Sequence, residues 1–247
     1  EETALNDRER GFLLLTSHLG DPERKVLTAA QLRALALRVR ERKPEAEGRE
    51  LTEKDLTELD YPEEAARQIV TLLSQEPLLD DYLARGETWG CVPLTRVSPG
   101  YPLLLRQRLG LDSPGCLWAK GDLSILNTPT LSLVGSRELR EPNRAFARRV
   151  GELAAERGIT LVSGNARGAD REAQDACRKA GGRVISIVAD SLDKYPGRNR
   201  LFLSEEDFDE PFSAQRALSR NRCIHALGTM VLVAQADLHK GGTWSGT

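Results

Sequence analysis

Four short segments of this chain combine glycine with Ser, Thr or Asn and at least one cation, a combination suited to binding phosphate. The segments are Gly135-Ser136-Arg137 and residues 163–170, 190–200 and 240–247. Glycine allows the backbone to approach an anion closely, and an arginine guanidinium donates paired hydrogen bonds to phosphate oxygens. A single glycine-rich turn is common for reasons of backbone geometry alone. Four of them in one chain predict a phosphate-binding surface.

Each of these segments follows, directly or within a few residues, a short apolar run that is typical of a buried strand. The predicted strands span residues 130–134, 159–162, 183–188 and 229–234, and amphipathic helices are predicted at 143–157, 169–180 and 213–227. This alternation predicts an α/β, Rossmann-like fold, a mostly parallel sheet with helices on both faces. Because the carboxyl ends of parallel strands meet at one edge of the sheet, all four segments are expected there, where ligands of such sheets bind.

The charges divide the chain into an acidic and a basic part. Residues 1–88 hold 13 Lys and Arg against 20 Asp and Glu, whereas residues 89–247 hold 22 against 17. For the acidic part, residues 1–88, the sequence predicts a small all-helical domain, SAM-like or helix-hairpin-helix-like. Its predicted helices begin after capping residues such as Thr28 and Thr52. Residues 89–247 form the predicted Rossmann-like domain, in which the proline-containing stretch 89–128 extends over the sheet edge.

Several classes of protein are excluded by what the sequence lacks. No apolar run approaches the ~20 residues that span a bilayer, and the four cysteines show no metal-ligand spacing. The chain contains neither GxGxxG after a strand nor GxxxxGK[ST], so neither a standard dinucleotide site nor a P-loop ATPase is indicated. No triad of nucleophile, base and acid is visible. We therefore predict a cytoplasmic protein that is not an enzyme and needs no metal or cofactor.

The ordered series of motifs resembles the DNA-processing protein A family, also called DprA or Smf. The matching segments are Val134-Gly135-Ser136-Arg137, residues 163–170, Lys194-Tyr195-Pro196 and Arg220-Asn221-Arg222, within a resemblance that covers residues 99–247. The resemblance implies a protein that binds single-stranded DNA without cutting it. It also implies protection of incoming DNA during competence and natural transformation, help in loading the RecA recombinase, and a homodimer formed through the Rossmann-like domain.

The resemblance also implies which residues contact DNA. Arg137 and Arg167 are expected to clamp phosphates, and Lys194, Arg198, Arg200, Arg220 and Arg222 are expected to form a basic rim. The full set of expected DNA- or phosphate-binding residues is Gly135, Ser136, Arg137, Ser163, Gly164, Asn165, Arg167, Gly168, Asp170, Lys194, Arg198, Arg200, Arg220, Asn221, Arg222, Lys240, Gly241, Gly242 and Thr243. Because family members continue beyond the fourth loop, we expect the C-terminal end to be truncated at Thr247.

Two other functions are compatible with the same fold and stay open at this point. A small-nucleotide sensor would use the same phosphate pocket and signal through the acidic helical domain. A nucleoside monophosphate phosphoribohydrolase would need a motif similar to PGGxGTxxE with a catalytic glutamate. Here Gly241-Gly242-Thr243 lacks the preceding proline, and Trp244-Ser245 intervenes before Gly246-Thr247. The enzyme interpretation is therefore the less favoured alternative.

Overall fold

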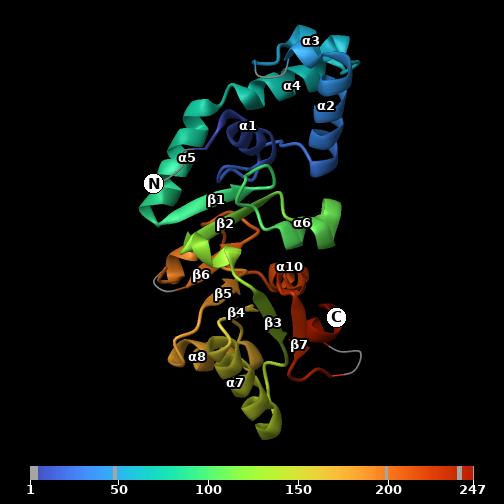
Figure 1. Ribbon diagram of the computed structural model, residues 1–247. Helices are drawn as coiled ribbons and strands as arrows, with labels where there is room; N and C mark the ends of the chain where they lie inside the picture. The colour runs from blue at the N-terminus through green and yellow to red at the C-terminus, as the bar shows by residue number, and fades with distance from the viewer. Residues whose placement is uncertain (1–4, 47–48, 198–199, 238–240, 247) are drawn as a thin grey trace. The chain divides into compact units, whose positions relative to one another are not determined.

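The computed structural model of the protein describes residues 5–46, 49–197, 200–237 and 241–246 (Figure 1). Its internal contacts divide the chain into two compact units. One comprises Glu1–Arg85 with Val97–Pro99, and the other comprises Gly86–Arg96 with Gly100–Thr247. The predicted boundary after residue 88, and the likeness of the first part to SAM or helix-hairpin-helix domains, remain predictions.

The first unit is built from short helices with well-formed N-termini. They are α1 (Asp7–Thr16), α2 (Ala29–Arg42), α3 (Glu53–Glu58), α4 (Glu63–Leu73) and α5 (Glu76–Thr88). Asn6, Thr28 and Thr52 each cap a helix through a reciprocal capping box, which satisfies backbone N–H groups that the first turn leaves unpaired. Leucine and isoleucine side chains such as Leu56 and Ile69 form the core of this unit.

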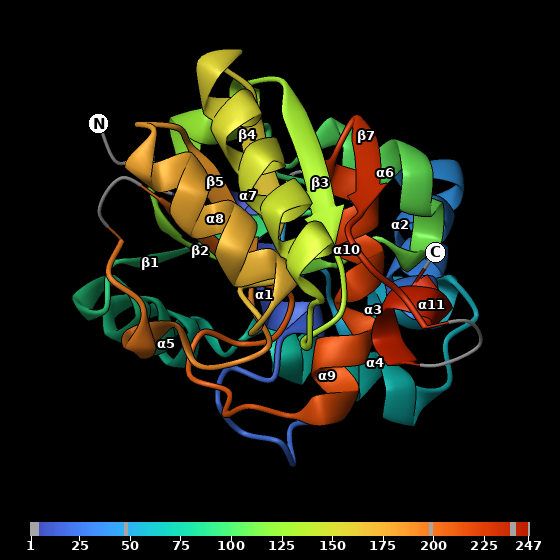
Figure 2. The same ribbon diagram turned by 90° about the horizontal axis from the view of Figure 1, so that it is seen from below.

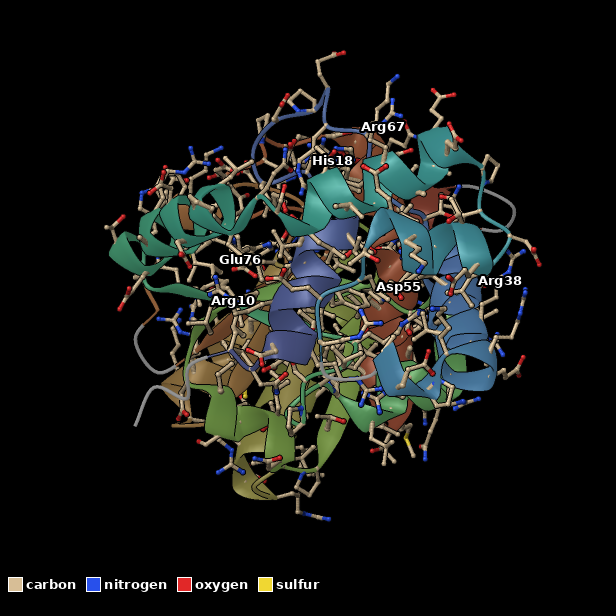
Figure 3. All side chains as sticks on the ribbon, turned by 90° about the horizontal axis from the view of Figure 1, so that it is seen from above. Arg10, His18, Arg38, Asp55, Arg67 and Glu76 are labelled. Carbon is tan, nitrogen blue, oxygen red and sulfur yellow. The ribbon has the colours of Figure 1, made fainter. Side chains whose placement is uncertain are left out.

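Ion pairs connect helices of this first unit. The Arg10 guanidinium of α1 donates to the carboxylates of Glu76 and Asp80 on α5 (Figure 3). The Asp55 carboxylate accepts from Arg49 and Lys43, at 2.8 and 3.0 Å, and also from its own capping partner Thr52. These hydrogen bonds hold the pKa of Asp55 far below its usual range, with Arg49 as the largest cause.

The second unit is a seven-stranded sheet in the order β1-β2-β6-β5-β4-β3-β7. Its strands are β1 (Cys91–Thr95), β2 (Cys116–Gly121), β3 (Thr130–Val134), β4 (Thr160–Ser163), β5 (Val184–Ile187), β6 (Leu201–Ser204) and β7 (Met230–Val233). The five strands from β6 to β7 in this order run parallel to one another, whereas β1 and β2 pair antiparallel and join β6. The predicted mostly parallel Rossmann-like sheet is confirmed.

Successive strand residues point to opposite faces of the sheet, and both sets are buried and largely apolar here. Helices therefore cover both faces. Helices α7 (Glu141–Glu156) and α8 (Ala169–Lys179) lie side by side on one face (Figure 2), where Leu133 and Leu161 pack against them. Helices α6 (Leu103–Leu109) and α10 (Asn221–Leu227) contribute to the core of the other face. No helix among the described residues is long and apolar enough to cross a membrane.

Three local predictions need correction. The extension 89–128 contributes the paired strands β1 and β2, which its many prolines hid. Strand β6 is missing from the predicted strands, because three apolar residues and a serine after an arginine-rich loop form no distinct pattern. The predicted helix 213–227 is divided into α9 (Ala214–Ser219) and α10 at Arg220, whose side chain is buried rather than aligned with a solvent-exposed helix face.

Candidate functional site

The loops that follow β3, β4 and β7 are hydrogen-bonded to one another at the carboxyl edge of the sheet. The Ser136 backbone N–H donates to the Gln235 carbonyl at 2.8 Å, and the Ala169 N–H donates to the Ser136 carbonyl at 3.1 Å. Since β3, β4, β5 and β7 run parallel, their carboxyl ends share this edge. The predicted convergence of these loops is confirmed by the strand pairing.

Gly168 allows two of these loops to come into contact. It has φ = +88°, and a Cβ at this position would collide with the backbone oxygens of Ser136 and Arg137. No side chain other than hydrogen therefore fits between the β4–α8 loop and the β3–α7 loop. The glycine brings Arg137 and Arg167 to the same place, on adjoining loops.

Replacing Gly168 by alanine is expected to destabilise the protein by roughly 3 kcal/mol. The positive φ costs about 1–2 kcal/mol, and the collision with backbone oxygens adds an overpacking cost of about 1–3 kcal/mol. Urea unfolding of the two proteins measures the difference. Gly181→Ala is the matched control, because Gly181 has φ = +77° but nothing within 4 Å of its Cβ position. An equal loss in both variants would contradict the close contact at Gly168.

Arg137 occupies the centre of the site. Its exposed side chain lines three neighbouring hollows of about 280, 450 and 1010 Å³. Its guanidinium forms no hydrogen bond or ion pair with any residue that the structure describes. The smallest of the three hollows, of about 280 Å³, is called here the central hollow. It is also lined by Asn165, Arg167, Tyr195 and Phe212.

Arg167 is similarly available to an anion. Its guanidinium lies 3.4 Å from the Glu138 carboxylate, but the two side chains are 72% and 87% exposed. An ion pair this exposed contributes little to stability, so a phosphate can replace Glu138 at small cost. Arg137 and Arg167 together present two guanidinium groups beside the central hollow, the arrangement that binds phosphate oxygens.

Arg220 lies beneath the site, where it connects three parts of the fold. Its side chain is buried, with 6% of the residue exposed, and it donates to the carbonyls of Gly164, Ile187 and Ala217. Gly164 must be glycine here, because a Cβ would lie only 2.6 Å from the Arg220 guanidinium. Arg220 is therefore not on a solvent-exposed rim, where the sequence analysis placed it.

A buried carboxylate accompanies this buried arginine. Asp170 accepts hydrogen bonds from the backbone N–H groups of Gly164 and Ala166 at 3.0 and 3.2 Å. Burial raises the pKa of Asp170, an effect that the charge of Arg220 and these N–H groups oppose. Burial likewise lowers the pKa of Arg220, opposed by Asp170. The pair holds the β4–α8 loop in shape from below and leaves Arg137 and Arg167 to face solvent.

A family model described as DNA recombination-mediator protein A matches residues 93–246 of this chain. The chain belongs to the DNA recombination-mediator protein A family. Protein Smf from Escherichia coli K12 is 34% identical over 142 residues, which cover 53% of this chain and 38% of that protein. The chain thus spans less than half the length of this relative.

Two solved members of the DNA recombination-mediator protein A family also match. The structure of DNA processing protein A from Streptococcus pneumoniae aligns with a TM-score of 0.64 and 24% identity, and covers 89% of this chain and 82% of that one. This match shows the fold. The homologue from Helicobacter pylori, studied for its single-stranded DNA binding mode, has a TM-score of 0.54 and 28% identity, and covers 63% and 74% of the two chains.

Other residues expected from the family resemblance are held by structural contacts. The Ser163 hydroxyl donates to the Leu133 carbonyl at 2.8 Å inside the sheet. Arg222 forms a two-pronged ion pair with Glu205, at 2.6 and 3.0 Å. Lys194 pairs with Asp190 at 2.7 Å but remains half exposed. Of these three residues, Lys194 retains the most exposed charge for a ligand.

The C-terminal part of the expected set lies along the intermediate hollow of about 450 Å³. Asn221, Gly241, Gly242 and Thr243 line it together with Gly135 and Ser136. The Asn221 side-chain amide donates to the Gly242 carbonyl at 3.3 Å. The fourth loop is thereby joined to the start of α10. Arg198 and Lys240 lie outside the described residues.

Arg200 is placed away from the site, contrary to the expected basic rim. It directly precedes β6, whose first residue Leu201 pairs with Ile185 of the parallel strand β5. The amino end of β6 lies at the sheet edge opposite to the carboxyl ends of β3 and β4. The loop from Asp190 to Arg200 therefore crosses from one edge to the other.

Three residues that line the site, Tyr195, Phe212 and Arg171, are not in the expected binding set. From the sequence, Tyr195 and Phe212 are expected near the site as aromatic residues, and the structure places both beside the central hollow, where Phe212 is 55% exposed. Arg171 is the residue that sequence reasoning missed. No group of three or more metal-ligating side chains occurs in the described part of the chain.

Proposed function

We propose that this protein binds single-stranded DNA and acts as a recombination mediator, without cleaving the strand. The observation that carries the proposal is the placement of Arg137, exposed and centred among three hollows beside Arg167. Phosphates of a flexible strand can reach both guanidinium groups from solvent. The single-stranded DNA binding of the Helicobacter pylori homologue supports the same ligand for this chain.

A binding role is supported by two carboxylates of the site, Asp170 beside the hollow of about 450 Å³ and Asp190 beside the central hollow. Asp170 is buried and accepts backbone hydrogen bonds, and Asp190 is paired with Lys194. Neither is positioned as a free general base beside the exposed arginines. Such a site stabilises a bound phosphate by charge and offers it no activated nucleophile, so the proposed protein is a binder rather than an enzyme.

The wider role that we propose follows the family resemblance. The protein would protect incoming single strands and help load RecA during natural transformation, acting in the cytoplasm as a homodimer formed through the Rossmann-like unit. The acidic helical part, residues 1–88, would serve as a separate docking domain. These steps require a protein that covers a strand of any sequence and then releases it. Contacts to phosphates suit this requirement, because they do not depend on the bases.

Fluorescence anisotropy of a labelled single strand of ~20 nucleotides tests this function. We expect binding that is preferred over duplex DNA and weakens steeply with salt, because phosphate contacts release about 0.7 counterions each from a single strand. Titration at two salt concentrations measures the slope. Light scattering of the same samples reports whether the protein is a dimer, and a RecA strand-exchange assay reports loading.

Competition with AMP distinguishes the alternatives. Displacement of the strand by low concentrations of AMP would favour a small-nucleotide sensor, and release of free base from AMP would favour a phosphoribohydrolase. An absence of strand binding at low salt would overturn the proposed function.

A further inference from the structure

The largest of the three hollows, about 1010 Å³, runs between α7 and α8 and is called here the α7–α8 groove. Side chains one helical turn apart line it on both sides, from Arg144 to Glu156 on α7 and from Arg171 to Lys179 on α8. Both helices follow parallel strands and therefore begin at the carboxyl edge of the sheet. One end of the groove thus opens directly at Arg137, and the other lies at the far edge.

The charges along the groove are unevenly distributed. Five arginines line its near half, the part next to the site, and they are Arg137, Arg144, Arg148, Arg167 and Arg171. Among the residues that the structure describes, three carboxylates pair with these arginines, those of Glu138, Glu141 and Glu172. Glu172 alone is shared by Arg144 and Arg148. The near half therefore keeps an excess of positive charge.

The far half of the groove is neutral by comparison. Its carboxylates are paired with arginines that do not line the groove: Glu152 and Glu156 with Arg149, at 3.1 and 2.9 Å, and Asp175 with Arg178, at 3.3 Å. Lys179 adds one exposed cation. An anionic polymer leaving the site is thus attracted along the first part of the groove and not beyond it.

Arg171 is the side chain that continues the site into the groove. It is exposed, and its guanidinium forms no hydrogen bond or ion pair within the described ranges of the chain. It lies in the first turn of α8, four residues after Arg167, which belongs to the preceding loop. On this side of the groove Arg171 is thus the next lining arginine after Arg167.

We propose that the near half of the α7–α8 groove binds the phosphates that follow those held by Arg137 and Arg167, with Arg171 as their contact. The groove thereby sets the direction in which a single strand leaves the site and lengthens its footprint. This inference rests on the proposed binding of single-stranded DNA. The shared Glu172 limits the attraction, because it neutralises part of the charge of Arg144 and Arg148.

Matched variants at the two ends of the same helix stripe test the groove. Arg171→Gln and Lys179→Gln each remove one exposed positive charge from α8, two helical turns apart. We expect Arg171→Gln to weaken binding of a ~20-nucleotide strand roughly three- to tenfold at low salt and to reduce the salt slope by about 0.7. Lys179→Gln should leave both unchanged within about twofold. Glu172→Gln should strengthen binding, because it releases two arginines.

The outcomes separate this inference from the function on which it rests. If the unmodified protein binds the strand but Arg171→Gln and Lys179→Gln behave alike, the groove proposal is wrong and the binding function stands. Unchanged or weaker binding by a folded Glu172→Gln variant also contradicts the groove. If the unmodified protein does not bind the strand at all, the proposed function itself fails.

Discussion

Arg137→Ala is expected to lower the affinity for a single strand of ~20 nucleotides by roughly 10- to 100-fold at low salt. Hydrogen bonds to a charged group contribute about 1.5–3 kcal/mol each, and Arg137 borders all three hollows of the site. Because its side chain is exposed and unpaired among the described residues, its removal leaves the fold intact. Anisotropy at two salt concentrations measures the loss of affinity and the accompanying loss of salt dependence.

Arg149→Ala is the control for this prediction. Arg149 is an exposed arginine of the same unit. It pairs with Glu152 and Glu156 toward the far end of α7. Its removal should change the affinity by less than about twofold. If the two variants lose affinity equally, the effect is one of net charge and the assignment of Arg137 to the site is refuted.

Arg220→Ala is expected to destabilise the protein by about 3–5 kcal/mol, the cost of leaving a buried charge without a compensating opposite charge. The substitution leaves the carbonyls of Gly164 and Ile187 without their donor and the buried Asp170 without its neighbouring positive charge. At roughly 2–4 °C per kcal/mol for a domain of this size, the melting temperature should fall by roughly 6–20 °C. Calorimetry or a thermal scan by circular dichroism measures the shift.

Arg216→Ala is the comparison for Arg220→Ala. It lies one turn earlier, and its ion pairs with Glu206 and Glu210 are partly exposed, so its loss should cost less than about 1 kcal/mol. A small effect of Arg220→Ala on stability together with a large loss of DNA affinity would mean that Arg220 reaches the ligand, against the buried position described above.

The family resemblance and the sheet were predictable because both depend on local sequence. Short apolar runs such as 130–134 alternate with amphipathic helices, and this periodicity is a property of neighbouring residues. Glycine at positions 135 and 164, directly after strands, indicated where the backbone turns. Parallel strands then require that these turns share one edge, so the position of Arg137 and Arg167 followed from the sequence.

The roles of the remaining basic residues were decided by tertiary structure. The local sequence around an arginine does not show whether its side chain will face solvent or buried carbonyl groups. Arg220 became a buried connector once β4, β5 and α9 supplied three carbonyls around it, and Gly164 left the space for its guanidinium. Arg200 lies away from the site because it directly precedes β6, a strand that the sequence did not indicate and whose amino end lies at the opposite edge of the sheet.

The charge distribution of the α7–α8 groove was likewise decided by tertiary structure. Composition and periodicity determined the fold class, the loops that converge and the two exposed arginines at their centre. They could not determine that Arg144 and Arg148 share Glu172 while Arg171 pairs with none of the described residues, because those contacts join two helices separated by a strand in the sequence. Charge pairing across helices depends on distances in three dimensions, and only the packing of α7 against α8 establishes them.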